Sequence, residues 1–360
     1  DYTLLGLERS AAGAALIPSR MAYGVTPQKI YSIKKDSIIS RIPIRPTRET
    51  PQLKLTYGEW IGKKWGWINF NKEMDNPTFQ GLKLIDSDER IIIPELKQDS
   101  EDSKKFLIIS PDTLSKGKSN FIIDKVLLNE QVELKDAKIS FRTVTKIDTS
   151  NLKLIKPTSS TLIRLDKDGG PELPIIFSKP ILIFSDSSFM MVSDSDTTFT
   201  KLEWINPTTT LFRPSDGWAE KKDYKLLIFS SELTPIEGKS FKDSIVYIDI
   251  KSGKKMGYGG LKGTIDFDSQ SILIELKSLE KREEIFHSIV NSNYQFEFNK
   301  IPEGSYTLMI INDINNDGIY NFGSVFPFKE SEWFYSYKDT FKVRANWDID
   351  LGVIEILGEK

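Results

Sequence analysis

The sequence predicts an all-β fold built from tandem antiparallel β-sandwiches, and three observations support this prediction. Short runs of β-branched and aromatic residues recur along the chain, bounded by Pro, Gly, Asn, Asp and Ser, as in strands joined by turns. Helical periodicity is scarce: residues 279–289 suit a short amphipathic helix, but a charged strand with a turn fits them as well. Turn-rich breaks also divide the chain into parts of about 100 residues, the usual size of an immunoglobulin-like sandwich.

The clearest strand patterns occur in nine short segments. They are residues 67–70, 106–109, 121–123, 138–141, 174–177, 226–229, 245–248, 272–276 and 306–311. In two places a proline precedes an aromatic residue by ten positions, Pro111 before Phe121 and Pro214 before Tyr224. This spacing predicts a turn fixed by the proline ring, followed by a strand whose aromatic side chain enters the core.

Two pairs of tyrosines indicate an internal repeat. Tyr2 and Tyr306 are 304 residues apart, and Tyr31 and Tyr335 are separated by the same 304 residues. Arrays of small stacked domains give such self-similarity at a fixed offset. We therefore predict that one module occurs twice, and that its first copy is truncated so that only the second half is present.

Breaks in the strand pattern predict the module boundaries. Residues 45–51 are polar and rich in proline, residues 148–151 interrupt a strand pattern, and residues 251–260 are rich in glycine and lysine. These breaks divide the chain into four parts, which are residues 1–45, 46–148, 149–252 and 253–360. We expect the first part to be half a sandwich and each of the others to be one β-sandwich.

The composition argues against several classes of function. The 360 residues have a net charge of −2 and form no basic block, so we expect no nucleic-acid partner. Cysteine is absent, which excludes disulfides and thiolate metal sites. No apolar run is long enough for a membrane-spanning helix. His287 is the only histidine, and acidic pairs such as Asp86 and Asp88 have the pattern of solvated charges, so we expect no enzymatic activity.

Several runs of residues resemble known β-sandwich families. Residues 46–148 resemble the bacterial Ig-like domain first described in S-layer proteins, and residues 149–252 resemble it more loosely. The runs that carry this resemblance are residues 68–75, 110–114, 120–123 and 139–143. The resemblance implies two tandem Ig-like sandwiches in the middle of the chain.

The last part of the chain, residues 253–360, resembles a carboxypeptidase-regulatory, transthyretin-like β-sandwich. Residues 263–265, residues 298–308 and the Asp-rich turn that follows carry this resemblance, and residues 343–348 resemble the same region of Bacteroidota Ig-like envelope proteins. By the repeat, residues 1–45 correspond to the second half of such a module. The resemblance implies export, as a lipoprotein or another component of the outer membrane, cell surface or periplasmic face, and it implies no catalytic residue.

Residues 313–318 match the first half of a calcium-binding loop. Asp313, Asn315 and Asp317 place oxygen ligands at alternate positions, and Gly318 permits the sharp turn. The twelfth position is Ser324, however, and lacks the bidentate Glu that closes an EF-hand. Two interpretations therefore stay open, a calcium site or a hairpin turn whose Asn, Asp and Gly supply backbone geometry. We predict no other cofactor.

Trp333, Tyr335 and Tyr337 form an aromatic cluster that shares one face of an extended segment. One interpretation is a surface that stacks on glycans or anchors a partner protein. The other is ordinary packing, because sandwich strands use alternating aromatic residues. Trp60, Trp65 and Trp67 form a second cluster with the same two interpretations.

These patterns favour a non-enzymatic, modular cell-envelope protein that acts as a scaffold or interaction subunit. Its expected partners are other envelope or outer-membrane proteins, because exposed strand edges of β-sandwiches are natural docking sites. Two alternatives stay open. The chain is a carbohydrate- or substrate-binding accessory region of a surface protein, or it supplies the spacer modules of a larger enzyme.

Overall fold

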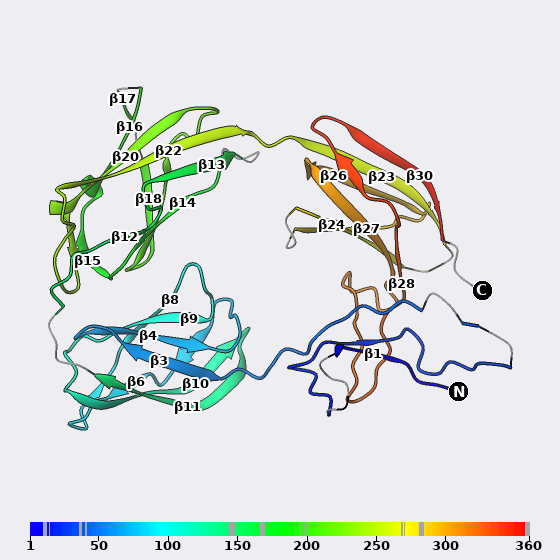
Figure 1. The fold of residues 1–360 in the computed structure, drawn as a ribbon, viewed down its shortest axis with the longest axis horizontal. Coiled ribbons are helices and arrows are strands. Elements are labelled where there is room, and N and C mark those ends of the chain that lie inside the picture. Colours follow the sequence, from blue (N-terminus) through cyan, green and yellow to red (C-terminus); the bar gives the residue numbers. More distant parts are fainter. Residues whose placement is uncertain are drawn as a thin grey trace. The chain divides into compact units, whose positions relative to one another are not determined.

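The structure is a computed structural model, and it describes residues 1–9, 13, 15–35, 38–39, 42–143, 148–165, 170–194, 196–198, 200–267, 269, 271–280 and 284–356. Strands dominate throughout (Figure 1), which confirms the all-β prediction, and all nine segments predicted to be strands lie in strands. The chain forms two compact units, Pro51–Lys255 and Asp1–Thr50 with Met256–Lys360. Within the described residues, no helix has the length and apolar character needed to span a membrane.

The first sandwich of the unit Pro51–Lys255 contains nine strands. They are β3 (Leu55–Trp60), β4 (Trp65–Phe70), β5 (Thr78–Gln80), β6 (Lys83–Ile85), β7 (Ile91–Ile92), β8 (Glu95–Gln98), β9 (Lys105–Ile109), β10 (Gly117–Leu128) and β11 (Gln131–Thr143). One sheet has the order β3-β4-β9-β8, and the other has the order β11-β10-β6-β7 with β5 also paired to β10. Figure 1 shows these two layers, and buried side chains such as Ile68, Phe106 and Phe121 form the core between them.

The second sandwich of this unit has two larger sheets. Their strands are β12 (Leu154–Lys156), β13 (Ser160–Leu165), β14 (Leu173–Phe177), β16 (Phe189–Ser193), β17 (Asp196–Thr198), β18 (Thr200–Asn206), β19 (Thr209–Pro214), β20 (Asp223–Phe229) and β22 (Ile245–Lys255). The sheet orders are β12-β14-β19-β18 and β13-β22-β20-β16-β17. The pair β13–β22 is parallel, and the strands between them in the sequence form the long crossover connection that a parallel pair requires.

A small sheet lies at one end of the second sandwich. It consists of β15 (Ile181–Phe184) and β21 (Leu233–Pro235), which are followed and preceded by the short 3₁₀ turns Asp186–Ser188 and Ser230–Glu232. Phe184 packs against Trp204 of β18, with ring centroids 4.5 Å apart. Among the described strands, β21 is the one partner of β15, and on the opposite edge the N–H of Ile181 donates a hydrogen bond of 2.7 Å to the carbonyl of Pro207.

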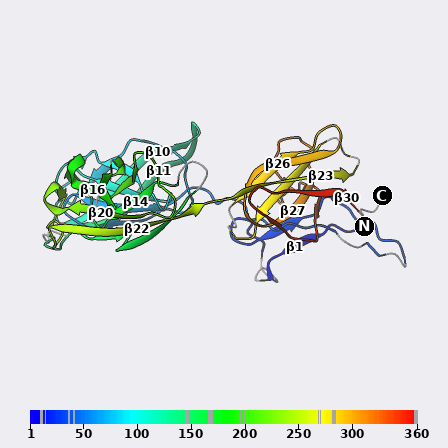
Figure 2. The ribbon, with the colours of Figure 1, turned by 90° about the horizontal axis from the view of Figure 1, so that it is seen from above.

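The second unit contains a third sandwich, formed by the C-terminal part of the chain. Its strands are β23 (Tyr258–Asp266), β24 (Ile272–Ser278), β25 (Ile285–Ile289), β26 (Gln295–Pro302), β27 (Gly304–Asn312), β28 (Phe334–Ser336), β29 (Phe341–Val343) and β30 (Asp348–Glu355). One sheet has the order β26-β23-β30 (Figure 2), and the other has the order β25-β24-β27-β28 with β29 also paired to β27. The segment 279–289, for which helix and strand were both open, forms strand β25 at its end, and residues 281–283 lie outside the described residues.

The N-terminal segment packs against this third sandwich. Strands β1 (Leu5–Leu7) and β2 (Tyr23–Val25) form an antiparallel pair. Tyr23 and Val25 share a small core with Val325, and the Ser331 hydroxyl donates a hydrogen bond of 2.9 Å to the carbonyl of Val25. Residues 1–50 and the C-terminal sandwich therefore form one compact unit, while the origin of residues 1–45 as a truncated copy stays a prediction.

Candidate functional site

The predicted calcium-binding loop follows β27 directly. Asp313 is fully buried, and its carboxylate accepts hydrogen bonds from the backbone N–H groups of Asp317 (3.1 Å) and Gly318 (2.9 Å). Asn316 and Gly318 have φ angles of 56° and 74°, the left-handed conformation that Asn and Gly adopt most readily. The Asp313 side chain thus closes a tight turn with the backbone of its own loop.

The second predicted carboxylate, Asp317, has partners in the same loop. It accepts hydrogen bonds from the Asn315 side chain (2.7 Å) and from the backbone N–H of Ile319 (2.9 Å). In the described part of the chain, no group of three or more His, Cys, Asp or Glu side chains has an arrangement that could hold a metal ion. Calcium binding by Asp313, Asn315 and Asp317 therefore stays a prediction.

Glu332 lies next to this loop and is 5% exposed. Its two oxygens accept hydrogen bonds from the backbone N–H groups of Ile314 (3.0 Å) and Asn321 (2.9 Å). Burial raises the pKa of Glu332; the hydrogen bond from Asn321 opposes this, whereas the nearby charges of Asp313 and Asp317 raise the pKa further. The loop and Glu332 together make this end of the third sandwich acidic.

A cleft of about 450 Å³ separates the N-terminal segment from the loop that follows β27. Pro27 and Lys29 line one side, and residues such as Asn321, Phe328 and Glu332 line the other. The two sides are tied together by the Glu330 carboxylate, which accepts a hydrogen bond of 2.9 Å from the backbone N–H of Lys29. Its lining residues lie in loops, most of them have polar or charged side chains, and Phe328 contributes the one aromatic ring.

The predicted aromatic cluster is half-buried. Trp333 stacks on Phe267, with ring centroids 5.1 Å apart, and Tyr335 and Tyr337 pack against the core of the third sandwich. Phe334 contacts a separate small core, so the side chains alternate as a strand requires. The three predicted residues thus share one face, and each of them makes packing contacts.

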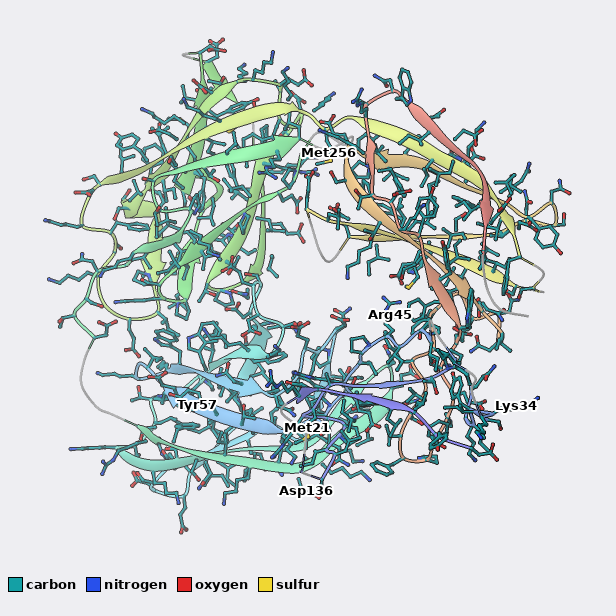
Figure 3. The ribbon with its side chains drawn as sticks, turned by 45° about the vertical axis from the view of Figure 1, so that its right-hand side comes forward. Met21, Lys34, Arg45, Tyr57, Asp136 and Met256 are labelled. Carbon is teal, nitrogen blue, oxygen red and sulfur yellow. The ribbon has the colours of Figure 1, made fainter. Side chains whose placement is uncertain are left out.

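The only histidine lies beside an ion pair. His287 of β25 faces Glu275 of β24, and its Nε2 atom is 3.7 Å from the Glu275 carboxylate. The same carboxylate accepts two hydrogen bonds from the guanidinium of Arg45, whose labelled side chain comes from the N-terminal segment in Figure 3. Arg45 also lies over the rings of Tyr320 and Phe322, 5.0 and 5.1 Å from their centroids, a cation–π arrangement.

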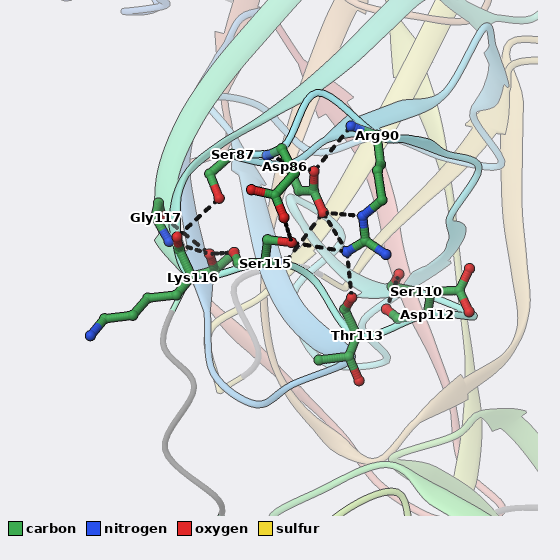
Figure 4. Close-up of polar contacts among 11 residues, drawn as sticks. Asp86, Ser87, Arg90, Ser110, Asp112, Thr113, Ser115, Lys116 and Gly117 are labelled. Carbon is green, nitrogen blue, oxygen red and sulfur yellow. Dashed lines mark hydrogen bonds and ion pairs between the residues drawn. The ribbon is translucent and has the colours of Figure 1, made fainter.

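A buried aspartate organises the loops at one end of the first sandwich (Figure 4). One carboxylate oxygen of Asp86 accepts hydrogen bonds from Arg90 Nε (2.9 Å) and from the backbone N–H of Ser115 (3.2 Å). Arg90 also donates to the carbonyl of Thr113 (3.0 Å), so the loop after β6 is tied to residues 110–115. The expectation that Asp86 is a solvated charge is therefore wrong, since its side chain is fully buried.

The hydrogen bonds to Asp86 lower its pKa by more than burial raises it. Burial by itself would raise the pKa of the carboxyl, but hydrogen bonds from Ser115, Arg90 and Asp88 lower it to about 2. Residues 110–114, which carry part of the resemblance to Ig-like domains, thus belong to a loop that Arg90 binds through the carbonyl of Thr113. The sequence pattern near Asp86 could not show this, because Ser115 lies 29 residues further along the chain.

A second carboxylate joins the two sandwiches of the unit Pro51–Lys255. Glu237 of the second sandwich accepts hydrogen bonds through Oε1 from the backbone N–H groups of Lys63 and Lys64 in the first sandwich. Its other oxygen, Oε2, is buried and has no hydrogen-bond partner among the described residues, and the same holds for Nε1 of Trp65. A Cβ atom on Gly62 would lie 2.8 Å from Oε2 and 2.5 Å from Nε1, so the joint leaves no room for a side chain at position 62.

Comparisons with known proteins show similarities to solved structures only. No protein-family model matches the chain, and no curated protein matches its sequence. Domains 1–6 of the surface layer protein SbsC are 12% identical with a TM-score of 0.26, over 83% of this chain and 54% of that chain. The major pilin subunit BcpA of Bacillus cereus is 10% identical with a TM-score of 0.21, over 76% of this chain and 93% of that chain.

A Bacteroides ovatus protein is similar to a comparable degree. This protein, SGBP-B of a mixed-linkage glucan utilization locus, was solved with a heptasaccharide and is 8% identical with a TM-score of 0.23, over 66% of this chain and 64% of that chain. The chain spans 44%, 54% and 55% of the three SbsC structures that it matches. Similarity at these levels assigns neither a family nor a function.

Proposed function

We propose that this chain is a non-enzymatic module of a bacterial cell envelope that holds a partner protein. The observation that carries the proposal is strand β15, whose residues Leu182, Ile183 and Phe184 are 63%, 60% and 44% exposed. Natural sheet edges are usually charged, twisted or covered, because a bare apolar edge pairs with other chains. An exposed apolar strand that has a second strand on one side only therefore supports a protein-binding role.

The chemistry of the charged side chains supports the non-enzymatic part of the proposal. Asp86 binds Arg90, Glu275 binds Arg45, and Glu237 binds the backbone of the neighbouring sandwich. Each of these carboxylates holds two segments of chain together. His287 is the only histidine of the sequence and would have to serve as any histidine base. It lies beside the carboxylate of Glu275, which also binds Arg45.

The proposal includes the extracytoplasmic location implied by the resemblance to envelope proteins, at the outer membrane, the cell surface or the periplasmic face. A carbohydrate-binding role is the second candidate, because the cleft next to Glu332 combines Phe328 with Asn and Lys side chains. Glycan sites, however, rely on exposed aromatic faces, and the ring of Trp333 is stacked on Phe267.

Affinity purification from the native envelope tests the proposed function. The tagged full-length protein is recovered after gentle solubilisation, and the co-purifying chains are quantified against it. We expect one envelope protein at a near-stoichiometric ratio. Recovery of the tagged protein alone, or with glycan but no protein, would contradict the proposal.

A further inference from the structure

A groove of about 510 Å³ lies where the two sandwiches of the unit Pro51–Lys255 meet. The first sandwich contributes Ile93, Glu95 and Ile109, and the second contributes Ile181, Leu182 and Ile236. The remaining lining residues are three prolines. The volume lies within the range of about 300–1,000 Å³ that is usual for ligand sites, and apolar walls with a few polar groups are typical of such sites.

The groove continues the interface that joins the sandwiches. Ile236 precedes Glu237, which binds the backbone of Lys63 and Lys64 in the first sandwich. Asn206, next to the lining residue Pro207, donates a hydrogen bond of 2.9 Å to the carbonyl of Gln98 at the end of β8. The two walls are therefore held by direct bonds between the sandwiches.

Two strands at the edges of their sheets contribute to the groove, and because the N–H of Ile181 already binds the carbonyl of Pro207, a segment that pairs with β15 would begin after Ile181. Strand β8 is the last strand of the sheet β3-β4-β9-β8, and β15 pairs with β21 alone among the described strands. Glu95 of β8 and Leu182 of β15 both line the groove. An extended segment can add to such an edge through backbone hydrogen bonds, while its alternate side chains enter apolar pockets.

The groove also carries one negative charge, that of Glu95. Glu95 is the single charged residue in its lining, and it forms no ion pair with another described residue. A basic side chain in an otherwise apolar ligand would complement the carboxylate, whereas an acidic one would be repelled. The ligand must therefore carry a charge opposite to that of Glu95, and pairing with the edge strands β8 and β15 requires it to be extended.

We propose that this groove binds an extended segment of a partner protein, apolar at alternate positions, with a lysine or arginine that meets Glu95. The proposal rests on the proposed function, since it names the site and the kind of partner. Backbone hydrogen bonds to β8 or β15 provide affinity, and the contact with Glu95 provides selectivity.

Binding of defined peptides tests the groove directly. The probes are a library of labelled, end-capped octapeptides with apolar residues at alternate positions and Lys, Arg, Gln or Glu at one central position. Fluorescence anisotropy with the full chain measures the affinities. We expect library members with Lys or Arg to bind at least tenfold more tightly than their Glu counterparts. A library without binders, or with no preference for the basic residue, would overturn the proposal.

Three variants of the full chain identify the site. Glu95→Lys is expected to reverse the charge preference, and Leu182→Glu is expected to weaken all binders at least tenfold. Leu162→Glu is the matched control, because Leu162 of the same sandwich is 62% exposed, against 63% for Leu182, and does not line the groove. Unchanged melting curves check that the variants fold. Equal effects of the two leucine substitutions, or an unchanged preference in Glu95→Lys, would place the binding elsewhere and refute the proposal.

The same variants separate this proposal from the proposed function. If the envelope partner is recovered equally with wild type and Leu182→Glu, the groove is not its site, although the chain still holds a partner. If the peptides bind the groove and no protein is recovered from the envelope, the groove proposal stands and the proposed function fails.

Discussion

The guanidinium of Arg45 forms two hydrogen bonds, of 2.9 and 3.1 Å, with the carboxylate of Glu275, a residue 230 positions away in the sequence. The side chain of Glu275 is 8% exposed, and Arg45 also lies over the rings of Tyr320 and Phe322. This pair, with the small core of Tyr23, Val25 and Val325, fixes residues 1–50 to the third sandwich.

Removing Arg45 should release the N-terminal segment. Arg45→Ala removes both guanidinium hydrogen bonds from the buried Glu275 carboxylate and leaves His287 Nε2, 3.7 Å away, as its nearest basic group, so we expect a loss of about 3 kcal/mol in the stability of this unit. Hydrogen exchange of residues 42–50 should become faster. Arg48→Ala is the control, because its ion pair with Glu8 is exposed and should contribute less than about 1 kcal/mol. Equal exchange in both variants would show that Arg45 does not fasten the segment.

The pKa of Asp86 predicts a loss of stability in acid. The carboxyl has a pKa of about 2 in the folded chain and 3.8 as its ordinary value, so the folded state binds the proton more weakly than the unfolded state. The stabilisation, about 2 kcal/mol, is complete above about pH 5 and is lost as the pH falls through 3.8 towards 2. We expect Asp86→Asn to be less stable than wild type at pH 7, with the difference shrinking between about pH 5 and pH 2.

Urea unfolding followed by hydrogen exchange of β6 and β10 measures this effect in the first sandwich. Asp124→Asn is the control, because the contact of Asp124 with Lys83 is exposed and 3.5 Å long. Asp148, which binds Lys179 in the second sandwich, also has a pKa of about 2 and should be unaffected by either substitution. A stability difference that stays constant from pH 7 to pH 2 would contradict the role given to Asp86.

Trp333 provides a test between packing and glycan binding. Because its ring stacks on Phe267 and is half-buried, we expect Trp333→Ala to destabilise its unit by about 2 kcal/mol. Trp347→Ala should have little effect, since Trp347 is 65% exposed. A glycan array with the wild-type chain should give no signal that depends on Trp333. A glycan that binds wild type and not a folded Trp333→Ala variant would favour the carbohydrate-binding alternative.

The two interpretations of the loop after β27 predict different melting curves. If Asp313, Asn315 and Asp317 bind calcium, saturating calcium at 100 times its dissociation constant adds about 2.7 kcal/mol to stability, and EDTA removes it. Asp317→Asn should then abolish the difference, while Asp339→Asn, at an exposed position in the same unit, should keep it. Identical curves with calcium and EDTA would favour a hairpin turn closed by its own hydrogen bonds.

Local patterns in the sequence predicted most of the strands. The apolar runs and the turn residues around segments such as 106–109 and 306–311 are short-range properties of the sequence. Strands β9 and β27 include these two segments. Phe121 and Tyr224, each ten residues after a proline, are 0% and 6% exposed, so both enter a core as predicted. Trp65 and Trp67 share a face of β4, and the ammonium of Lys105 lies 4.0 Å from the ring centroid of Trp67.

Long-range partners could not be predicted from the same patterns. Glu275 and Arg45 are 230 residues apart, and Glu237 binds a loop 173 residues away. Asp86 and Asp88 have the local pattern of surface charges, yet tertiary structure buries Asp86 beneath Arg90 and Ser115. The groove arises from the meeting of two sandwiches, so neither Glu95 nor Leu182 has a signal in its own neighbourhood.

Site-specific cross-linking in living cells tests whether the chain holds a partner protein at strand β15, where Leu182 lines the groove. A photoreactive phenylalanine analogue replaces Leu182 in one strain and Leu162 in another, and the adducts are analysed after illumination. We expect one protein adduct of defined mass at position 182 and none at position 162. Cells without a protein adduct at position 182, or with the same adducts at both positions, would show that no partner is held at this strand.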